Sequence, residues 1–139
     1  MGRMIGLDLG TRTLGIAMSD ALGIIASGIE TFRFLDGHYD AALQRVAELV
    51  KLHQVQEIVL GLPLHMSGES GEGAQRSLAF AQQIEELLGI KPVMLDERWT
   101  TQLAKQRLLD ADLSRKKRKQ VIDKMAAVVI LQNYLDRKR

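Results

Sequence analysis

Carboxylates at three places in the chain could converge on one chemical site. Asp8 lies inside the apolar stretch 4–9, and a buried carboxylate is costly unless a cation or hydrogen bonds compensate its charge. Asp is also depleted in β-strands. A purely structural role is therefore the weaker explanation for Asp8. Its candidate companions are the neighbouring pair Asp96–Glu97 and, further along the chain, Asp123.

The chemistry that such a cluster predicts is that of a divalent metal. Carboxylates repel one another at close range unless cations lie between them, and hard oxygen ligands suit Mg²⁺ or Mn²⁺. Two such ions about 3.5–4 Å apart can activate a water and stabilise the leaving oxygen in phosphodiester cleavage. We expect Asp8 to be the bridging ligand, with Glu97 and Asp123 closing the site and Asp96 as a second choice of ligand.

Most of these acids also have an ordinary structural explanation. Asp123 could complement the dipole near a helix N-terminus, Glu97 could pair with Arg98, and Asp96 could cap a following helix. The three histidines show no metal-ligand spacing, and no arrangement of serine, histidine and aspartate is evident. The cluster therefore depends mainly on Asp8.

Positive charge is concentrated in the last quarter of the chain. Residues 115–139 hold nine Lys/Arg and two Asp/Glu, a balance of +7, whereas residues 1–114 have a balance of −5. Five basic residues shortly before Asp123 could bind phosphates, as could Arg98 and Lys124. The five are Arg115, Lys116, Lys117, Arg118 and Lys119. The alternative explanation is a solvated basic helix end.

The length and composition fit a soluble globular protein of one domain, residues 1–139, and the order of its predicted elements given below makes it α/β. Apolar residues make up 46% of the chain, and no apolar run is long enough for a membrane span. The chain contains no cysteine, which removes thiolate metal sites and disulfides and fits a cytoplasmic location. The N-terminus lacks the pattern of a signal peptide.

The pattern along the chain predicts three strands followed by alternating helices and strands. Later strands should be parallel, while the first three form an antiparallel meander, so that the sheet is mixed. In the helix 74–88 we expect Leu78, Ala81, Ile84 and Leu88 on one face. The predicted strands are 4–9, 14–19, 24–34, 57–60 and 92–95; the predicted helices are 41–53, 74–88, 100–109 and one from 115–119 to about 135.

A strand that ends in Asp-x-Gly-Thr also begins the actin-like and Hsp70-like ATPases, in which the turn holds nucleotide phosphates. Those ATPases clamp ATP between two domains, and a chain of 139 residues has room for one. No second phosphate loop is evident. An ATP-binding module is therefore an unfavoured alternative.

Four motifs in order resemble the YqgF/RuvX family of pre-16S rRNA nucleases and Holliday junction resolvases, in particular its Bacillus-like members. The resemblance covers essentially the whole chain. The motifs are 6–11 (GLDLGT) with 15–17 (GIA), 59–63 (VLGLP), 96–101 (DERWTT) and 123–127 (DKMAA).

The resemblance implies a ribonuclease H-like fold related to RuvC, with a mixed five-stranded sheet and helices on both faces. It implies a cytoplasmic, divalent-metal-dependent endonuclease whose acids are Asp8, Glu97 and Asp123. RuvC has a further acid three positions after the last of these, where this chain has Ala126. The resemblance therefore does not decide whether the site holds one metal ion or two.

The expected role is maturation of the 5′ end of pre-16S rRNA, with the ribosome as a further partner. The alternatives are resolution of branched DNA, which requires symmetric cuts and favours a homodimer over a monomer, and a non-catalytic, ribosome-associated RNA-binding factor.

Overall fold

The computed structural model describes residues 2–63, 71–96 and 115–138, with the backbone alone described for 115–124. The predicted helix 100–109 lies outside these residues. None of the described helices is both long and apolar enough to cross a membrane.

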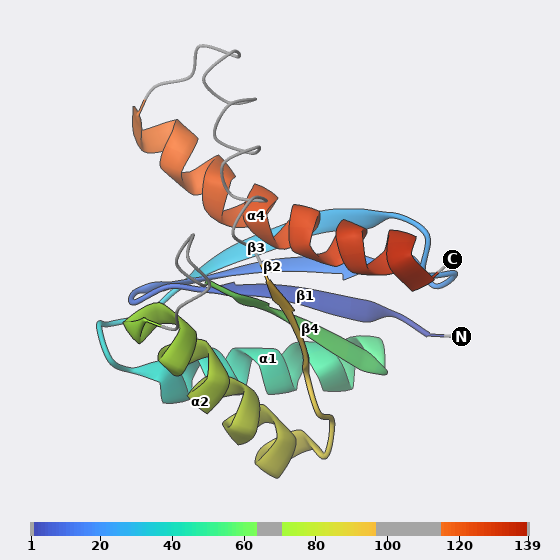
Figure 1. Ribbon diagram of the computed structural model, residues 1–139, viewed down its shortest axis with the longest axis horizontal. Coiled ribbons are helices and arrows are strands. Elements are labelled where there is room, and N and C mark those ends of the chain that lie inside the picture. Colours follow the sequence, from blue (N-terminus) through green and yellow to red (C-terminus); the bar gives the residue numbers. More distant parts are fainter. Residues whose placement is uncertain (1, 64–70, 97–114, 139) are drawn as a thin grey trace.

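Five strands form one mixed sheet in the order β3-β2-β1-β4-β5, which places β1 at the centre (Figure 1). The first three strands pair antiparallel, and β1, β4 and β5 are parallel, as the sequence predicts. The strands are β1 (Met4–Leu9), β2 (Thr13–Ser19), β3 (Ala26–Arg33), β4 (Glu57–Leu62) and β5 (Val93–Asp96).

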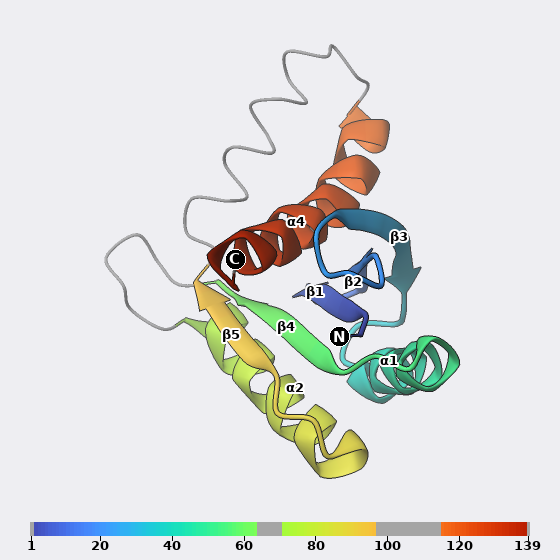
Figure 2. The same ribbon diagram turned by 90° about the vertical axis from the view of Figure 1, so that its right-hand side faces the viewer.

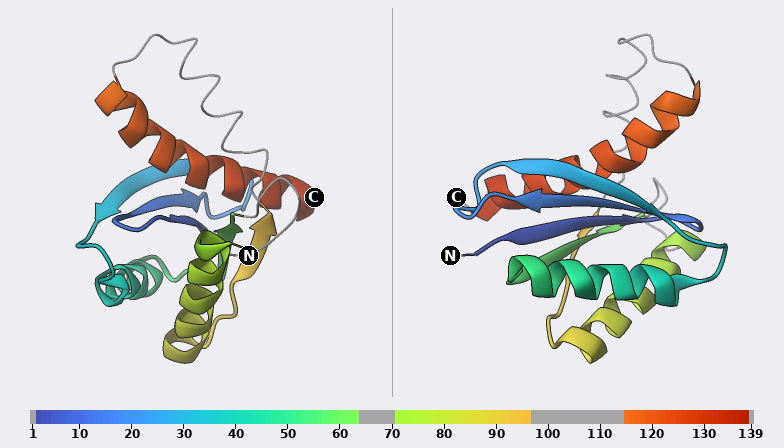
Figure 3. Two further views of the ribbon diagram at one scale, coloured as in Figure 1. Left: turned by 60° about the vertical axis from the view of Figure 1, so that its left-hand side comes forward. Right: turned by 180° about the vertical axis from the view of Figure 1, so that it is seen from behind.

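The helices lie on both faces of the sheet, which confirms the predicted layers. Figure 2 and Figure 3 show α1 and α2 on one face and α4 crossing the other. The helices are α1 (Tyr39–His53), α2 (Glu72–Leu88) and α4 (Arg115–Lys138). A left-handed Gly89 ends α2, as expected for a glycine that follows a helix.

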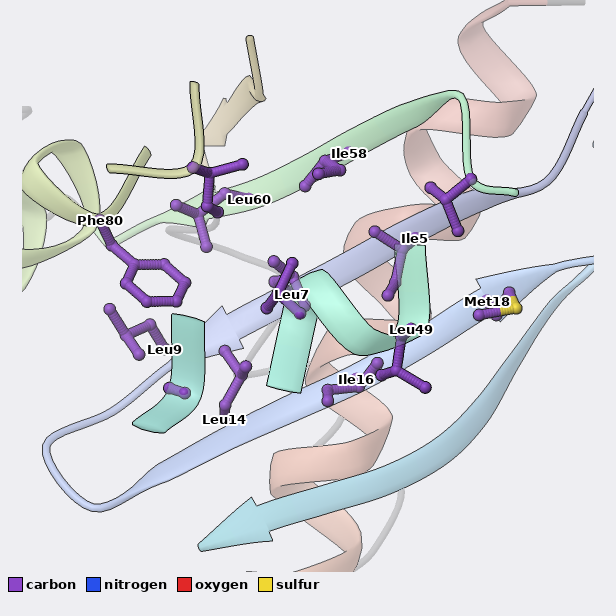
Figure 4. Close-up of a cluster of buried hydrophobic side chains, with 14 residues drawn as sticks. Ile5, Leu7, Leu9, Leu14, Ile16, Met18, Leu49, Ile58, Leu60 and Phe80 are labelled. Atoms are coloured by element: carbon purple, nitrogen blue, oxygen red, sulfur yellow. The ribbon is translucent and has the colours of Figure 1, made fainter. Parts of the chain in front are cut away.

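The face covered by α1 and α2 carries the larger aliphatic core (Figure 4). Alternate residues of β1, namely Ile5, Leu7 and Leu9, point into it because side chains alternate along a strand. The helices contribute Val46, Leu49, Phe80 and Ile84, among others.

Two details of the sequence prediction differ from the structure. Leu78 is 45% exposed, because α2 turns Ser77 and Phe80 toward the sheet instead. Asp96 is the last residue of β5 and pairs with Leu62, so it lies inside the strand and not beyond its end.

Candidate active site

Asp8 lies near the carboxyl end of the central strand, on the face that α4 covers. It is half-buried, and its neighbours Leu7 and Leu9 point to the opposite face. In open α/β sheets, functional groups gather at the carboxyl ends of the parallel strands. The structure therefore places Asp8 at the edge of the sheet where such groups gather.

No side chain stands beside Asp8 on either neighbouring strand. Asp8 pairs with Gly15 of β2, and the register between Leu7 and Leu60 sets the following residue, Gly61 of β4, beside Asp8 on the other side. Both glycines are buried. Glycine inside a strand often marks a close approach of a ligand or another backbone, and here neither neighbouring strand places a side chain next to Asp8.

Gly6, two residues before Asp8 on the same face, lets α4 come close to the sheet. A methyl group added at Gly6 would lie 2.6 Å from Cβ of Leu131 and 3.0 Å from the carbonyl oxygen of Ala127. Ala127 is fully buried, so a small residue on α4 and a glycine on β1 together allow the helix to lie close to the sheet.

The direction of α4 brings its earlier turns toward Asp8. Lys138, at the C-terminal end of α4, binds Glu57, the first residue of β4. The N-terminal turns of the helix therefore lie toward the carboxyl ends of the parallel strands (Figure 1). Asp123 precedes Ala127 by four residues, about 6 Å of helix, and Asp8 follows Gly6 by two, about 6.6 Å of strand. Asp123 therefore lies one helical turn before Ala127, toward the end of the sheet at which Asp8 lies.

Two polar contacts fix α4 along the sheet. The Gln132 amide donates to the carbonyl oxygen of Ile24 and accepts from the backbone N–H of Ala26, both at 2.9 Å. Nζ of Lys138 lies 2.7 and 2.8 Å from the Glu57 carboxylate oxygens. These hydrogen bonds raise the pKa of Lys138 above its ordinary value. They hold the C-terminal half of α4 in one register.

Asp96 lies on the other face of the sheet. Its neighbour Leu95 packs under α4, whereas Met94 packs against the core beneath α1 and α2. Because side chains alternate, Asp96 shares the face of Met94 and is exposed there. The structure therefore does not bring Asp96 and Asp8 together.

The remaining predicted residues lie outside the described side chains. Glu97 and Arg98 lie outside the described residues, and for Asp123, Lys124 and the basic run 115–119 only the helical backbone is described. Among the side chains that the structure does describe, no group of three potential metal ligands occurs. The three-acid cluster thus stays a prediction.

The sequence prediction missed the glycines that surround Asp8. Gly6, Gly15 and Gly61 each interrupt an apolar strand, and an isolated glycine in a strand signals a close approach. The signal was present, but the face to which each glycine belongs depends on the pairing of the strands.

Comparison with known proteins points to one family. The family model described as "RuvX: Holliday junction resolvase" matches residues 2–137. A protein of Halalkalibacterium halodurans named "Putative pre-16S rRNA nuclease" is 53% identical over 99% of this chain and 98% of its own length. A Bacillus cereus protein of the same name is 50% identical over 98% of this chain and 99% of its own length.

A solved structure extends the likeness to the fold. Thermus thermophilus RuvC, in complex with a Holliday junction substrate, superposes with a TM-score of 0.61 at 12% identity, covering 99% of this chain and 96% of that one. The mixed sheet and its helices are thus those of the ribonuclease H-like fold that the sequence predicted. Because the family model matches residues 2–137 and a relative is 53% identical over nearly the whole chain, this chain belongs to the RuvX family.

Proposed function

We propose that this protein is a divalent-metal-dependent endonuclease that cleaves structured nucleic acid, with the 5′ region of pre-16S rRNA as its substrate. The observation that carries the proposal is the position of Asp8. It stands at the carboxyl edge of the central strand, under α4, with glycine on both neighbouring strands. The names of its curated relatives supply the substrate.

Asp8, Glu97 and Asp123 would hold Mg²⁺ or Mn²⁺. Asp8 fits this role because it offers hard oxygen ligands and has glycine beside it on both neighbouring strands. We assign the second acid to Glu97, since Asp96 lies on the opposite face from Asp8. When bound, the metal would act as a Lewis acid that activates water and stabilises the charge of the phosphate in the transition state.

The chain itself contributes position and charge. Strand pairing on both sides of β1 holds the Asp8 backbone rigidly, so its carboxylate is preorganised. The close approach of α4 at Gly6 would hold the turn that carries Asp123 on the face of the sheet that carries Asp8. Arg98, Lys124 and the basic run 115–119 would neutralise the phosphates of the substrate. We place the reaction in the cytoplasm.

The test compares labelled pre-16S rRNA with a four-way DNA junction, each incubated with Mn²⁺ or with EDTA. The proposal predicts metal-dependent cutting of the rRNA that is lost in Asp8→Asn and Asp123→Asn. Binding without cutting in every condition would contradict the nuclease and favour a ribosome-associated binding factor.

Resolution of Holliday junctions is the second candidate, and the family description favours it. A resolvase must cut two strands symmetrically, which calls for two copies of the chain. Paired cuts in the four-way junction, made by a species that sediments as a dimer, would select this activity over rRNA processing.

A further inference from the structure

Two exposed arginines lie at the same edge of the sheet as Asp8. Arg12 lies in the turn between β1 and β2, and Arg33 is the last residue of β3. Thr13 pairs with Arg33, and the backbone N–H of Phe34 donates to the carbonyl oxygen of Arg12 at 2.9 Å. The two arginines therefore start from adjoining backbone positions.

Arg33 also shares a face with Asp8. Its neighbours Phe32 and Phe34 both pack against the core beneath α1 and α2, so strand alternation turns Arg33 to the face of α4. Figure 4 shows β1 and β3 (light blue) running in the same direction, so their carboxyl ends meet at one edge.

The pairing of the strands determines the distance between Asp8 and Arg33. Asp8 pairs with Gly15 and Gly15 with Thr31, which puts Thr31 two strands away from Asp8 in the same row. Arg33 lies two residues further along β3. With about 4.8 Å between strands and 3.3 Å per residue, the Cα atoms of Asp8 and Arg33 are about 12 Å apart.

The charge of this pair is poorly compensated within the chain. Arg12 lies 3.9 Å from Asp36, and the two side chains are 74% and 61% exposed, so the ion pair contributes little. Arg33 is exposed and forms no ion pair within the part of the chain that the structure describes. Adjacent like charges are unfavourable, and an anion bound across both would relieve the repulsion.

We propose that Arg12 and Arg33 bind the phosphodiester backbone of the nucleic acid, a few nucleotides from the phosphate cleaved at Asp8. The inference deepens the proposed function and rests on it for the position of the cleaved phosphate. A separation of about 12 Å corresponds to a small number of nucleotides along one strand. The planar guanidinium group binds phosphate oxygens bidentately.

The experiment measures binding to a labelled single-stranded RNA from the 5′ region of pre-16S rRNA, and to a DNA duplex, over a series of salt concentrations. All variants are made in an Asp8→Asn background, so that no substrate is cut. Arg33→Ala and Arg12→Ala should each reduce the slope of log K against log salt by roughly 0.7 for the single strand and 0.9 for the duplex. Arg33→Lys should restore most of that slope.

The matched control is Arg137→Ala. Arg137 is an exposed arginine at the far end of α4, beside Lys138, which binds the start of β4. Its replacement removes the same charge and should leave the slope unchanged. Asp36→Asn should tighten binding, because it frees Arg12 from its only acidic neighbour among the described residues.

Slopes for Arg33→Ala and Arg12→Ala that equal the Arg137→Ala slope, in variants with unchanged thermal unfolding, would overturn the inference. A failure of the proposed function looks different: wild type would leave pre-16S rRNA uncut in Mn²⁺ while the arginine variants still lowered the slope. Metal-dependent cutting with unchanged slopes would instead keep the nuclease and remove the arginine site.

Discussion

The two faces of the central strand are built from opposite kinds of residue. One face of β1 presents Ile5, Leu7 and Leu9 to a dense aliphatic core, whereas the other presents the partly buried Met4, then Gly6 and Asp8, to α4. The first face buries large apolar side chains, which is the main source of folding free energy. The second gives up that burial and gains close backbone contact and a carboxylate.

In this fold, folding stability and chemistry depend mainly on opposite faces of the same central strand. Because strand side chains alternate, a single strand can serve both purposes in successive residues. Substitutions on the core face should therefore reduce the free energy of unfolding and spare the activity of the folded molecules. Substitution of Asp8 on the α4 face should do the reverse, whereas substitution of Gly6, which α4 contacts closely, should affect both.

Leu7→Ala should have the largest effect on stability. Leu7 is fully buried at the centre of the core, and truncation of such a leucine costs about 2–5 kcal/mol through lost burial and a residual cavity. Denaturant unfolding measures the loss. Leu78→Ala on the exposed side of α2 is the matched control and should change the free energy of unfolding by no more than about 0.5 kcal/mol.

Gly6→Ala should destabilise the fold by about 1–3 kcal/mol, since the added methyl group would collide with Leu131 and with the Ala127 carbonyl. The helix must move away from the sheet, so cleavage by the remaining folded protein should also fall. Single-turnover assays corrected for the folded fraction measure this. Full activity per folded molecule would mean that the close approach of α4 has no part in catalysis.

Gln132→Ala should have a smaller effect, about 0.5–1.5 kcal/mol, because the amide forms two hydrogen bonds to the backbone of Ile24 and Ala26. Faster hydrogen exchange at the Ala26 amide would locate the loss. Gln132→Glu keeps the acceptor and removes the donor, so the Ala26 amide should stay protected. Equal exchange rates in wild type and Gln132→Ala would show that the Gln132 side chain does not protect the backbone at Ile24 and Ala26.

The sequence predicted the elements well because their signals are local. Alternation identified β1, the glycine after residue 88 identified the end of α2, and the order of strands and helices predicted the mixed sheet with a central β1. Leu78 was assigned to the wrong side, because a helix with apolar residues in several directions does not reveal which one the larger Phe80 selects.

The candidate site was less predictable than the fold. Asp8 stood out because a carboxylate interrupts an apolar strand. To choose between Asp96 and Glu97, one must know which residues of β5 point toward the face that α4 covers. The positions of Gly15, Gly61 and Arg33 relative to Asp8 depend on pairing between distant strands. No local pattern in the chain encodes that register.

The most direct test of the account compares Asp8→Asn with Asp96→Asn in Mn²⁺-dependent cleavage of labelled pre-16S rRNA. Both changes remove one carboxylate charge at the carboxyl edge of the sheet, but on opposite faces. The account predicts a loss of at least roughly 100-fold for Asp8→Asn, since even the groups that support metal ligands cost 10–100-fold when lost, and near wild-type cleavage for Asp96→Asn. Equal losses in the two variants, or full activity in Asp8→Asn, would contradict it.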